Sequence, residues 1–224
     1  MADVIAENSV KSFIDEMRSA HGVDKGVWGE RAALRLLLDV YRERGGILIH
    51  SYEYKTDPTK NGNIKKGDDG KHYLENLGPY TEIDILYVSQ YRVFPIEIKS
   101  YEAQTIRLTT EGIAGCAVTN KSPIHQNEMH CNHLYSAIAE SINGNPQFIV
   151  PIVCFMTWHN KPIIEDQRPD IERGYILTAN TNTLVDTIKK CDTPLGCRIN
   201  LDMIDRQLRA VMNSADTYYP VQWR

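Results

Sequence analysis

Apolar residues recur along the chain with two different periods, and the changes between them predict its secondary structure. In residues 4–18 and 27–44 they return every three or four positions, as in helices with one buried face. Runs rich in β-branched and aromatic residues predict strands at residues 47–54, 81–88, 92–100, 148–158 and 175–177. Three further helices are predicted at residues 124–142, 183–190 and 201–213.

The order of these elements is helix, three strands, helix and strand, which predicts an α/β fold with helices on both faces of one sheet. A chain of 224 residues suits a single domain, 1–224, with a core at about residues 24–160. We expect an N-terminal helix within residues 1–20 and C-terminal helices within residues 181–215 as additions to this core. Residues 55–80 are polar and rich in Gly and Lys, so we expect a long polar loop there.

Composition narrows the class of protein. An apolar share of 42% suffices for a sizeable core. No run approaches the roughly 18 apolar residues that span a bilayer, and the first residues lack the layout of a signal peptide. We therefore expect a cytoplasmic protein without a membrane partner. The five cysteines are widely spaced and include no CxxC pair, which argues against a disulfide framework and a zinc ribbon. A net charge of −4 is not typical of a nucleic-acid binder, although metal-dependent nucleases need acidic residues.

The two strands at residues 81–88 and 92–100 carry the main candidate chemistry. If they form a hairpin that is symmetric about Gln90 and Tyr91, Asp84 lies directly opposite Glu97. Cross-strand neighbours have Cβ atoms roughly 5 Å apart. Lys99 follows Glu97 by two positions and therefore projects from the same face of its strand. The sequence thus predicts two carboxylates and one ammonium group at one place.

Two neighbouring carboxylates in an apolar hairpin repel each other unless a cation lies between them. Oxygen ligands suit Mg²⁺ or Mn²⁺, and such a cation can promote hydrolysis of a phosphodiester. Lys99 would orient or deprotonate the attacking water, or neutralise the scissile phosphate. The alternative is a cross-strand salt bridge on a solvated sheet face. Two other triplets of the type [DE]xK begin at Glu53 and Asp69, but neither has the hairpin context.

Two more polar residues lie on predicted helices. Glu30 shares a helix face with apolar residues that should pack on the sheet, so it is a candidate further metal ligand. Alternatively, it complements the helix dipole in the first turn. Gln126 begins the helix at residues 124–142 and could contact the scissile phosphate or metal-associated water, or could simply be exposed.

Basic and zinc-binding residue types suggest two separate possibilities. Lys65, Lys66 and Lys71 crowd into the polar segment and would contact nucleic-acid phosphates, unless this segment is only a solvated loop.

A zinc site is the rival to a magnesium site, with candidate ligands His125, His130, Cys131 and His133. Helical spacing lets only His130 and His133 meet.

Four ordered segments resemble the nuclease-related domain (NERD) family, a branch of the PD-(D/E)xK nuclease superfamily. They are Gly26-Val27-Trp28-Gly29-Glu30, Thr81-Glu82-Ile83-Asp84, Phe94-Pro95-Ile96-Glu97-Ile98-Lys99 and Ser122-Pro123-Ile124-His125-Gln126. Their order and spacing agree with the family across roughly residues 24–160.

The resemblance implies a restriction-endonuclease-like, three-layer α/β/α sandwich with a central mixed sheet and an αβββαβ core. It also implies Mg²⁺ dependence, with Mn²⁺ as a substitute, and DNA as the partner, with RNA as the alternative. Carried over by position, it makes Asp84, Glu97 and the Ile98 carbonyl metal ligands, with Glu30 as the helix carboxylate. It makes Lys99 the catalytic lysine and Gln126 an accessory amide.

Several alternatives stay open beside this resemblance. One is an inactive module that keeps the nuclease fold and binds DNA or a protein. A homodimer and a separate helicase or other DNA-processing partner are both compatible with the sequence. Two features depart from the family pattern: the length of residues 55–80, and Pro95 in the catalytic strand. Since Pro95 removes a backbone donor, it predicts an edge strand or a bulge.

Overall fold

The computed structural model describes residues 25–55, 62–66, 72–76, 80–101, 105–109, 112–113, 123–157 and 163–223. The helix expected within residues 1–20 lies outside these ranges. Among the described residues, no helix is long and apolar enough to cross a membrane.

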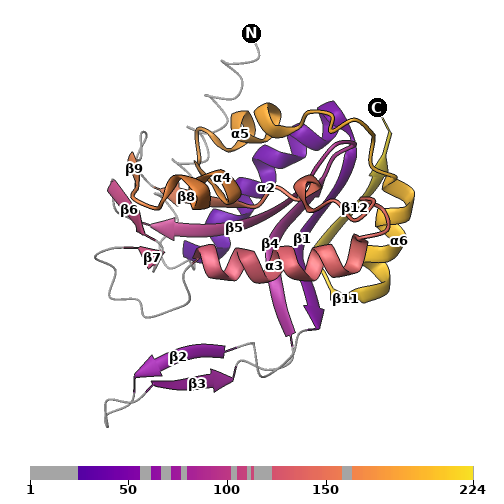
Figure 1. Cartoon of the computed structure of the whole chain (residues 1–224). Helices are drawn as coiled ribbons and strands as arrows, with labels where there is room; N and C mark the ends of the chain where they lie inside the picture. The colour runs from indigo at the N-terminus through magenta and orange to yellow at the C-terminus, as the bar shows by residue number, and fades with distance from the viewer. Residues whose placement is uncertain are drawn as a thin grey trace.

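A mixed sheet of seven strands forms the centre of the described structure (Figure 1). Its strands are β1 (Gly46–Lys55), β4 (Tyr80–Val88), β5 (Val93–Tyr101), β8 (Ile152–Thr157), β10 (Leu177–Asn180), β11 (Met212–Ser214) and β12 (Thr217–Gln222). They follow the order β10-β8-β5-β4-β1-β11, and β12 also pairs with β1. Strands β10, β8 and β5 are parallel to one another, whereas β4 is antiparallel to both of its neighbours, β5 and β1. The expectation of a central mixed sheet is confirmed.

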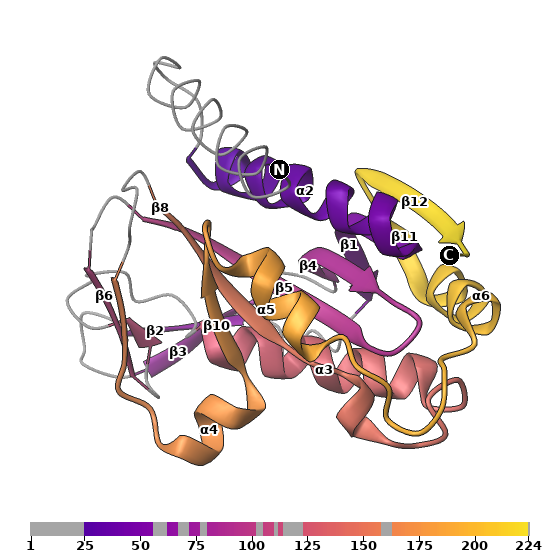
Figure 2. The same cartoon turned by 90° about the horizontal axis from the view of Figure 1, so that it is seen from above.

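Helices cover both faces of this sheet (Figure 2). On one face, α2 (Lys25–Arg44) and α5 (Leu184–Cys191) bury residues such as Leu37 and Ile188 against Ile96. On the other, α3 (Pro123–Ile138) and α6 (Leu201–Val211) bury residues such as Leu134 and Leu208 against the sheet. Two apolar clusters therefore lie on opposite sides of one sheet, which confirms the expected layers.

The hairpin of β4 and β5 has the predicted register. Ile85 pairs with Ile96, and Val88 pairs with Val93 beside the turn. The Ser89 hydroxyl closes this turn by accepting hydrogen bonds from the N–H groups of Tyr91 and Arg92, at 3.0 and 2.9 Å.

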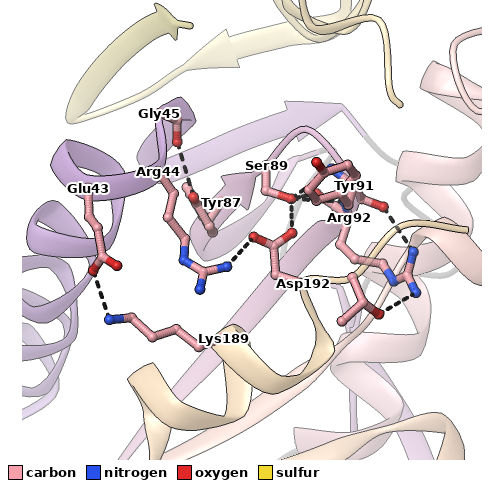
Figure 3. Close-up of polar contacts among 10 residues, drawn as sticks. Glu43, Arg44, Gly45, Tyr87, Ser89, Tyr91, Arg92, Lys189 and Asp192 are labelled. Atoms are coloured by element: carbon pink, nitrogen blue, oxygen red, sulfur yellow. Dashed lines mark hydrogen bonds and ion pairs between the residues drawn. The ribbon is translucent and has the colours of Figure 1, made fainter. Parts of the chain in front are cut away.

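Buried Asp192 anchors the same turn from outside (Figure 3). Its carboxylate accepts a hydrogen bond from the Ser89 hydroxyl. It also forms an ion pair with Arg44, whose Nη1 lies 3.0 Å from Oδ2. Since Arg44 ends α2 and Asp192 follows α5, this contact joins two helices to the hairpin that carries the candidate residues.

The prediction that Pro95 marks an edge strand or a bulge is wrong. Strand β5 lies between β4 and β8, and Pro95 pairs with Leu86 in the regular register. The continuous ladder with β8 begins one residue later, at Ile96 opposite Ile152. The N–H that proline lacks therefore falls outside that ladder, which explains why a central strand tolerates it.

The expectation of one long loop at residues 55–80 is also wrong. Strands β2 (Gly62–Lys66) and β3 (His72–Asn76) form an antiparallel pair within this segment. A third, three-stranded sheet consists of β6 (Thr105–Thr109), β7 (Gly112–Ile113) and β9 (Ile163–Asp166).

The C-terminal part differs most from the prediction. The helix expected at residues 201–213 ends at Val211, and β11 and β12 follow it onto the central sheet. Both α5 and α6 bury apolar residues in the two main clusters, so they belong to the core and are not additions to it. Tyr175 ends the short helix α4 (Asp170–Tyr175), so the strand expected from residue 175 begins at Leu177. The strand expected from residue 148 begins at Ile152, after a 3₁₀ turn, Pro146–Phe148, and Pro151.

Candidate active site

The structure brings Asp84, Glu97 and Lys99 together at one end of the β4–β5 hairpin. The Lys99 ammonium donates to Oε1 of Glu97, which is fully buried, while 29% of the Lys99 side chain remains exposed. The N–H of Ile98 donates to Oδ2 of Asp84 at 2.6 Å. The regular ladder of the hairpin ends at Ile85 and Ile96, one residue before Asp84 and Glu97, and the two carboxyl groups lie close enough to influence each other's charge.

The two carboxylates have opposite electrostatic environments. Loss of solvent raises the pKa of Asp84 well above its ordinary value, the charge of Glu97 adds to this effect, and Lys99 and the Ile98 N–H only partly offset it. Burial also acts to raise the pKa of Glu97, but Lys99 and His130 outweigh it and leave this pKa lowered. The single lysine thus compensates Glu97 and leaves Asp84 without sufficient positive charge.

The donor set suits a small, hard cation. Because the N–H and C=O of a strand residue point to the same edge, the Ile98 carbonyl points toward the side where its N–H meets Asp84. Two carboxylates and this carbonyl supply the oxygen ligands that Mg²⁺ and Mn²⁺ prefer. In the described ranges, no three side chains of His, Cys, Asp or Glu converge closely enough to hold a metal ion. A cation here would therefore need backbone or water oxygens in addition to Asp84 and Glu97.

Gln126 reaches the same place from α3. Its Oε1 lies 3.4 Å from the Lys99 ammonium. The next residue, buried Asn127, fixes this end of the helix by donating to the carbonyls of Ile152, at 2.9 Å, and Pro95, at 3.4 Å. These contacts tie α3 to both β5 and β8, so Gln126 faces β5.

Glu30 lies nearby but contacts another partner. Its Oε2 is 3.5 Å from Nε2 of His50 on β1, and its charge contributes to the raised pKa of Asp84. The helix can approach β5 closely here because Gly29 has no side chain: a Cβ at this position would lie 2.0 Å from the Ser100 hydroxyl. Glu30 therefore influences the site through its charge, without touching Asp84 or Glu97 in the described contacts.

Two further residues complete the surroundings of Glu97: His130, which the sequence analysis named only as a candidate zinc ligand, and Tyr54, which it did not name. Nε2 of His130 lies 3.3 Å from the Glu97 Oε2, and Nδ1 of the same ring lies 2.9 Å from the hydroxyl of Tyr54 on β1. The available signal was the spacing on α3, because His130 follows Gln126 by four residues and so lies on the same helix face.

Comparison with known proteins identifies the family. The model of the nuclease-related domain matches residues 25–156, which is more than half of the chain. The chain belongs to the NERD family. The matched segment of this NERD protein begins at α2 and ends within β8, and it includes every residue of the cluster around Glu97. The searches of curated proteins and of solved structures gave no match.

The candidate zinc ligands of the NERD segment have other contacts. The His133 ring stacks on Tyr54, with centroids 3.5 Å apart, and its Nε2 lies 3.3 Å from the Tyr52 hydroxyl. His125 is exposed and pairs with Glu128. Burial raises the pKa of the Cys131 thiol to about 12. His125 and His133 therefore have partners within the protein, and the zinc site stays an untested alternative.

The basic residues proposed for phosphate binding lie in the segment between β1 and β4. Lys65 and Lys66 end strand β2 and pair with Tyr73 and His72 of β3. Lys71 lies outside the described residues. The interaction of this segment with nucleic acid stays a prediction.

Proposed function

We propose that this NERD protein is a divalent-metal-dependent nuclease that hydrolyses phosphodiester bonds of DNA. The main support is the charge balance at the hairpin end. Asp84 and Glu97 bring two carboxyl groups into a largely desolvated place, Lys99 supplies one positive charge, and the pKa of Asp84 stays raised. A divalent cation supplies the charge that is missing.

The cation would be held by Asp84, Glu97 and the Ile98 carbonyl. When bound there, Mg²⁺ or Mn²⁺ offsets negative charge on the scissile phosphate and makes attack by water easier. The rest of the catalytic work falls to side chains of the protein itself.

Lys99 is the residue best placed to act on the substrate. Its ammonium is held by Glu97 and lies 3.4 Å from the Gln126 amide oxygen, so its positive charge has a fixed position. The Lys99 side chain is also partly exposed, so a substrate can approach it. In our proposal this charge stabilises the phosphate as negative charge builds on it during the attack of water. Gln126 keeps the lysine in position.

The fold supports the same proposal. In chain order α2, β1, β4, β5, α3 and β8 would form the αβββαβ core of a PD-(D/E)xK nuclease. The β2–β3 pair is then an insertion between the first two core strands, and β10 to β12 extend the sheet at its two ends.

The test is cleavage of supercoiled plasmid and of labelled single-stranded DNA, with Mg²⁺, Mn²⁺ or EDTA. Asp84→Ala and Lys99→Ala should each reduce metal-dependent cleavage by about 100-fold or more. Asp186→Ala and Lys190→Ala are matched controls, because both residues are exposed on α5, which carries none of the candidate site residues, and these variants should cut like the wild type. The size of the products separates endonuclease from exonuclease activity.

The possible results separate the alternatives. Cleavage that needs the cation and is lost in both site variants supports the proposal. A folded protein that binds Mg²⁺ but cuts neither the plasmid nor the single-stranded DNA would indicate RNA as the substrate. If the protein neither cuts nor binds the cation, the module that retains the fold without the activity becomes the better explanation.

A further inference from the structure

A buried polar chain lies behind Glu97, on the side away from Lys99. It runs from the Tyr54 hydroxyl to the two ring nitrogens of His130 and on to Oε2 of Glu97. Tyr54 is 2% exposed, and His130 and Glu97 are completely inaccessible. Burying three polar side chains is costly unless each is satisfied. Apolar side chains at these positions would pack in the core without that cost, so the stability of the fold alone does not explain why the three polar residues are there.

We infer that His130, itself oriented by Tyr54, is a positioning residue that fixes the Glu97 carboxylate for cation binding. This inference rests on the proposed nuclease function. It assigns His130 and Tyr54 no contact with the substrate and no share in the chemical step.

The hydrogen positions follow from the partners of the imidazole. A carboxylate that holds a cation is ionised, so the oxygens of Glu97 can only accept hydrogen bonds. Nε2 of His130 must therefore carry the hydrogen that points at Oε2. In the neutral ring Nδ1 is then the acceptor, and the Tyr54 hydroxyl is the donor that selects this tautomer.

The consequence for Glu97 is a carboxylate held at both oxygens. Lys99 contacts Oε1 and His130 contacts Oε2. Each carboxylate oxygen offers two lone pairs, so each keeps one for a cation. With only the lysine contact, the carboxylate could turn about its terminal bonds, and its free lone pairs would no longer have a fixed direction relative to Asp84.

A second tyrosine–histidine pair beside the first provides an internal control. Tyr52 precedes Tyr54 by two residues on β1, and its hydroxyl lies 3.3 Å from Nε2 of His133, one turn further along α3. This hydroxyl also lies 3.5 Å from the carbonyl of Leu208, and neither Tyr52 nor His133 has a described contact with Glu97. Tyr52→Phe and Tyr54→Phe thus remove the same buried group from the same strand, but only one of them interrupts the chain to Glu97.

The experiment is calorimetric titration of the full-length protein with Mg²⁺ and Mn²⁺, combined with cleavage rates across a range of Mg²⁺ concentrations. We expect His130→Ala to weaken cation binding by about 10- to 100-fold. His130→Gln should recover part of this loss, because its amide N–H can replace Nε2–H. Tyr54→Phe should bind the cation more weakly than Tyr52→Phe, which should match the wild type. Excess Mg²⁺ should restore much of the cleavage in the His130 variants, as lost affinity predicts.

The outcomes distinguish this inference from the proposal on which it depends. A wild-type protein that neither binds a cation nor cuts nucleic acid overturns both. A wild type that does both, with His130→Gln, Tyr54→Phe and Tyr52→Phe all indistinguishable from it in cation affinity, overturns only the positioning role. Equal losses of affinity in the two tyrosine variants would also overturn it, because the effect would then be one of general stability. Circular dichroism confirms folding, and the two conservative variants carry the test if His130→Ala does not fold.

Discussion

Substituting Gly29 by alanine tests a close approach between α2 and β5. The added Cβ would lie 2.0 Å from the Ser100 hydroxyl and 3.4 Å from both Ile98 Cγ2 and Met156 Cβ. The first distance is far inside van der Waals contact, whereas the other two are merely tight. Either Ser100 leaves its rotamer or α2 moves away from β5. In the second case Glu30, which lies on α2, moves with the helix.

The magnitude follows from two opposing effects. Alanine is more favourable than glycine in a helix by about 1 kcal/mol, whereas overpacking a core contact costs about 1–3 kcal/mol. We therefore expect Gly29→Ala to lower the free energy of unfolding by about 1 kcal/mol. The Ser100 hydroxyl is buried and has no hydrogen-bond partner among the described atoms, so Ser100→Ala alone should cost little. In the double variant the clash is absent, and the helix gain should make it at least as stable as the wild type.

Urea unfolding of the wild type, the two single variants and the double variant measures these differences and closes a double-mutant cycle. The coupling energy between positions 29 and 100 should be about 1–3 kcal/mol. If Gly29→Ala is as stable as the wild type and the cycle shows no coupling, Ser100 simply turns aside. The idea that this glycine sets the distance between α2 and β5 would then be wrong.

Three further predictions concern charge. Burial, with a smaller effect from His130, lowers the pKa of His133 to about 4, against 6.5 in the unfolded chain. The unfolded state therefore binds the proton first, so this stability is complete above pH 6.5 and is lost as the pH falls toward 4. The loss should be on the order of 2 kcal/mol and should vanish in His133→Gln, as urea unfolding across this range would show. Asp192→Asn should lower the free energy of unfolding by about 2 kcal/mol, more than the exposed control Asp186→Asn, in the same assay. Replacing Lys65 and Lys66 together by alanine should weaken DNA binding and reduce the slope of log affinity against log salt by about 1.8; an unchanged slope in fluorescence titrations would show that they contact no phosphate.

The features that local pattern determines could be predicted from the sequence. The register of the β4–β5 hairpin was predicted correctly because a short polar turn separates two strands of fixed period, and this register decides which residues meet. The face of α2 that packs on the sheet was also correct, since Leu37 and Ala33 are buried there. The meeting of Asp84, Glu97 and Lys99 follows from this register and from the two-residue period of β5.

The features that depend on distant partners could not be predicted. His130 and Tyr54 are 76 positions apart in the sequence, and no local period relates a strand residue to a helix that follows so much later. Strand β11 has three residues and directly follows a helix, so its pattern merges with that of α6. Pro95 was misjudged because its missing donor matters only where a neighbouring ladder needs it, and the start of β8 was unknown.

The pairing of β1 with the C-terminal strands has a consequence for biosynthesis. One edge of β1 pairs with β4 soon after it is made, but the other edge waits for residues 212–222. Until then an apolar strand presents unpaired N–H and C=O groups, and such edges recruit other chains. The same strand carries His50 and Tyr54, which contact Glu30 and His130. In a ribosome-bound chain, the two β1 residues that support the candidate active site therefore lie on a strand that is paired along one edge only, until residues 212–222 add the second pairing.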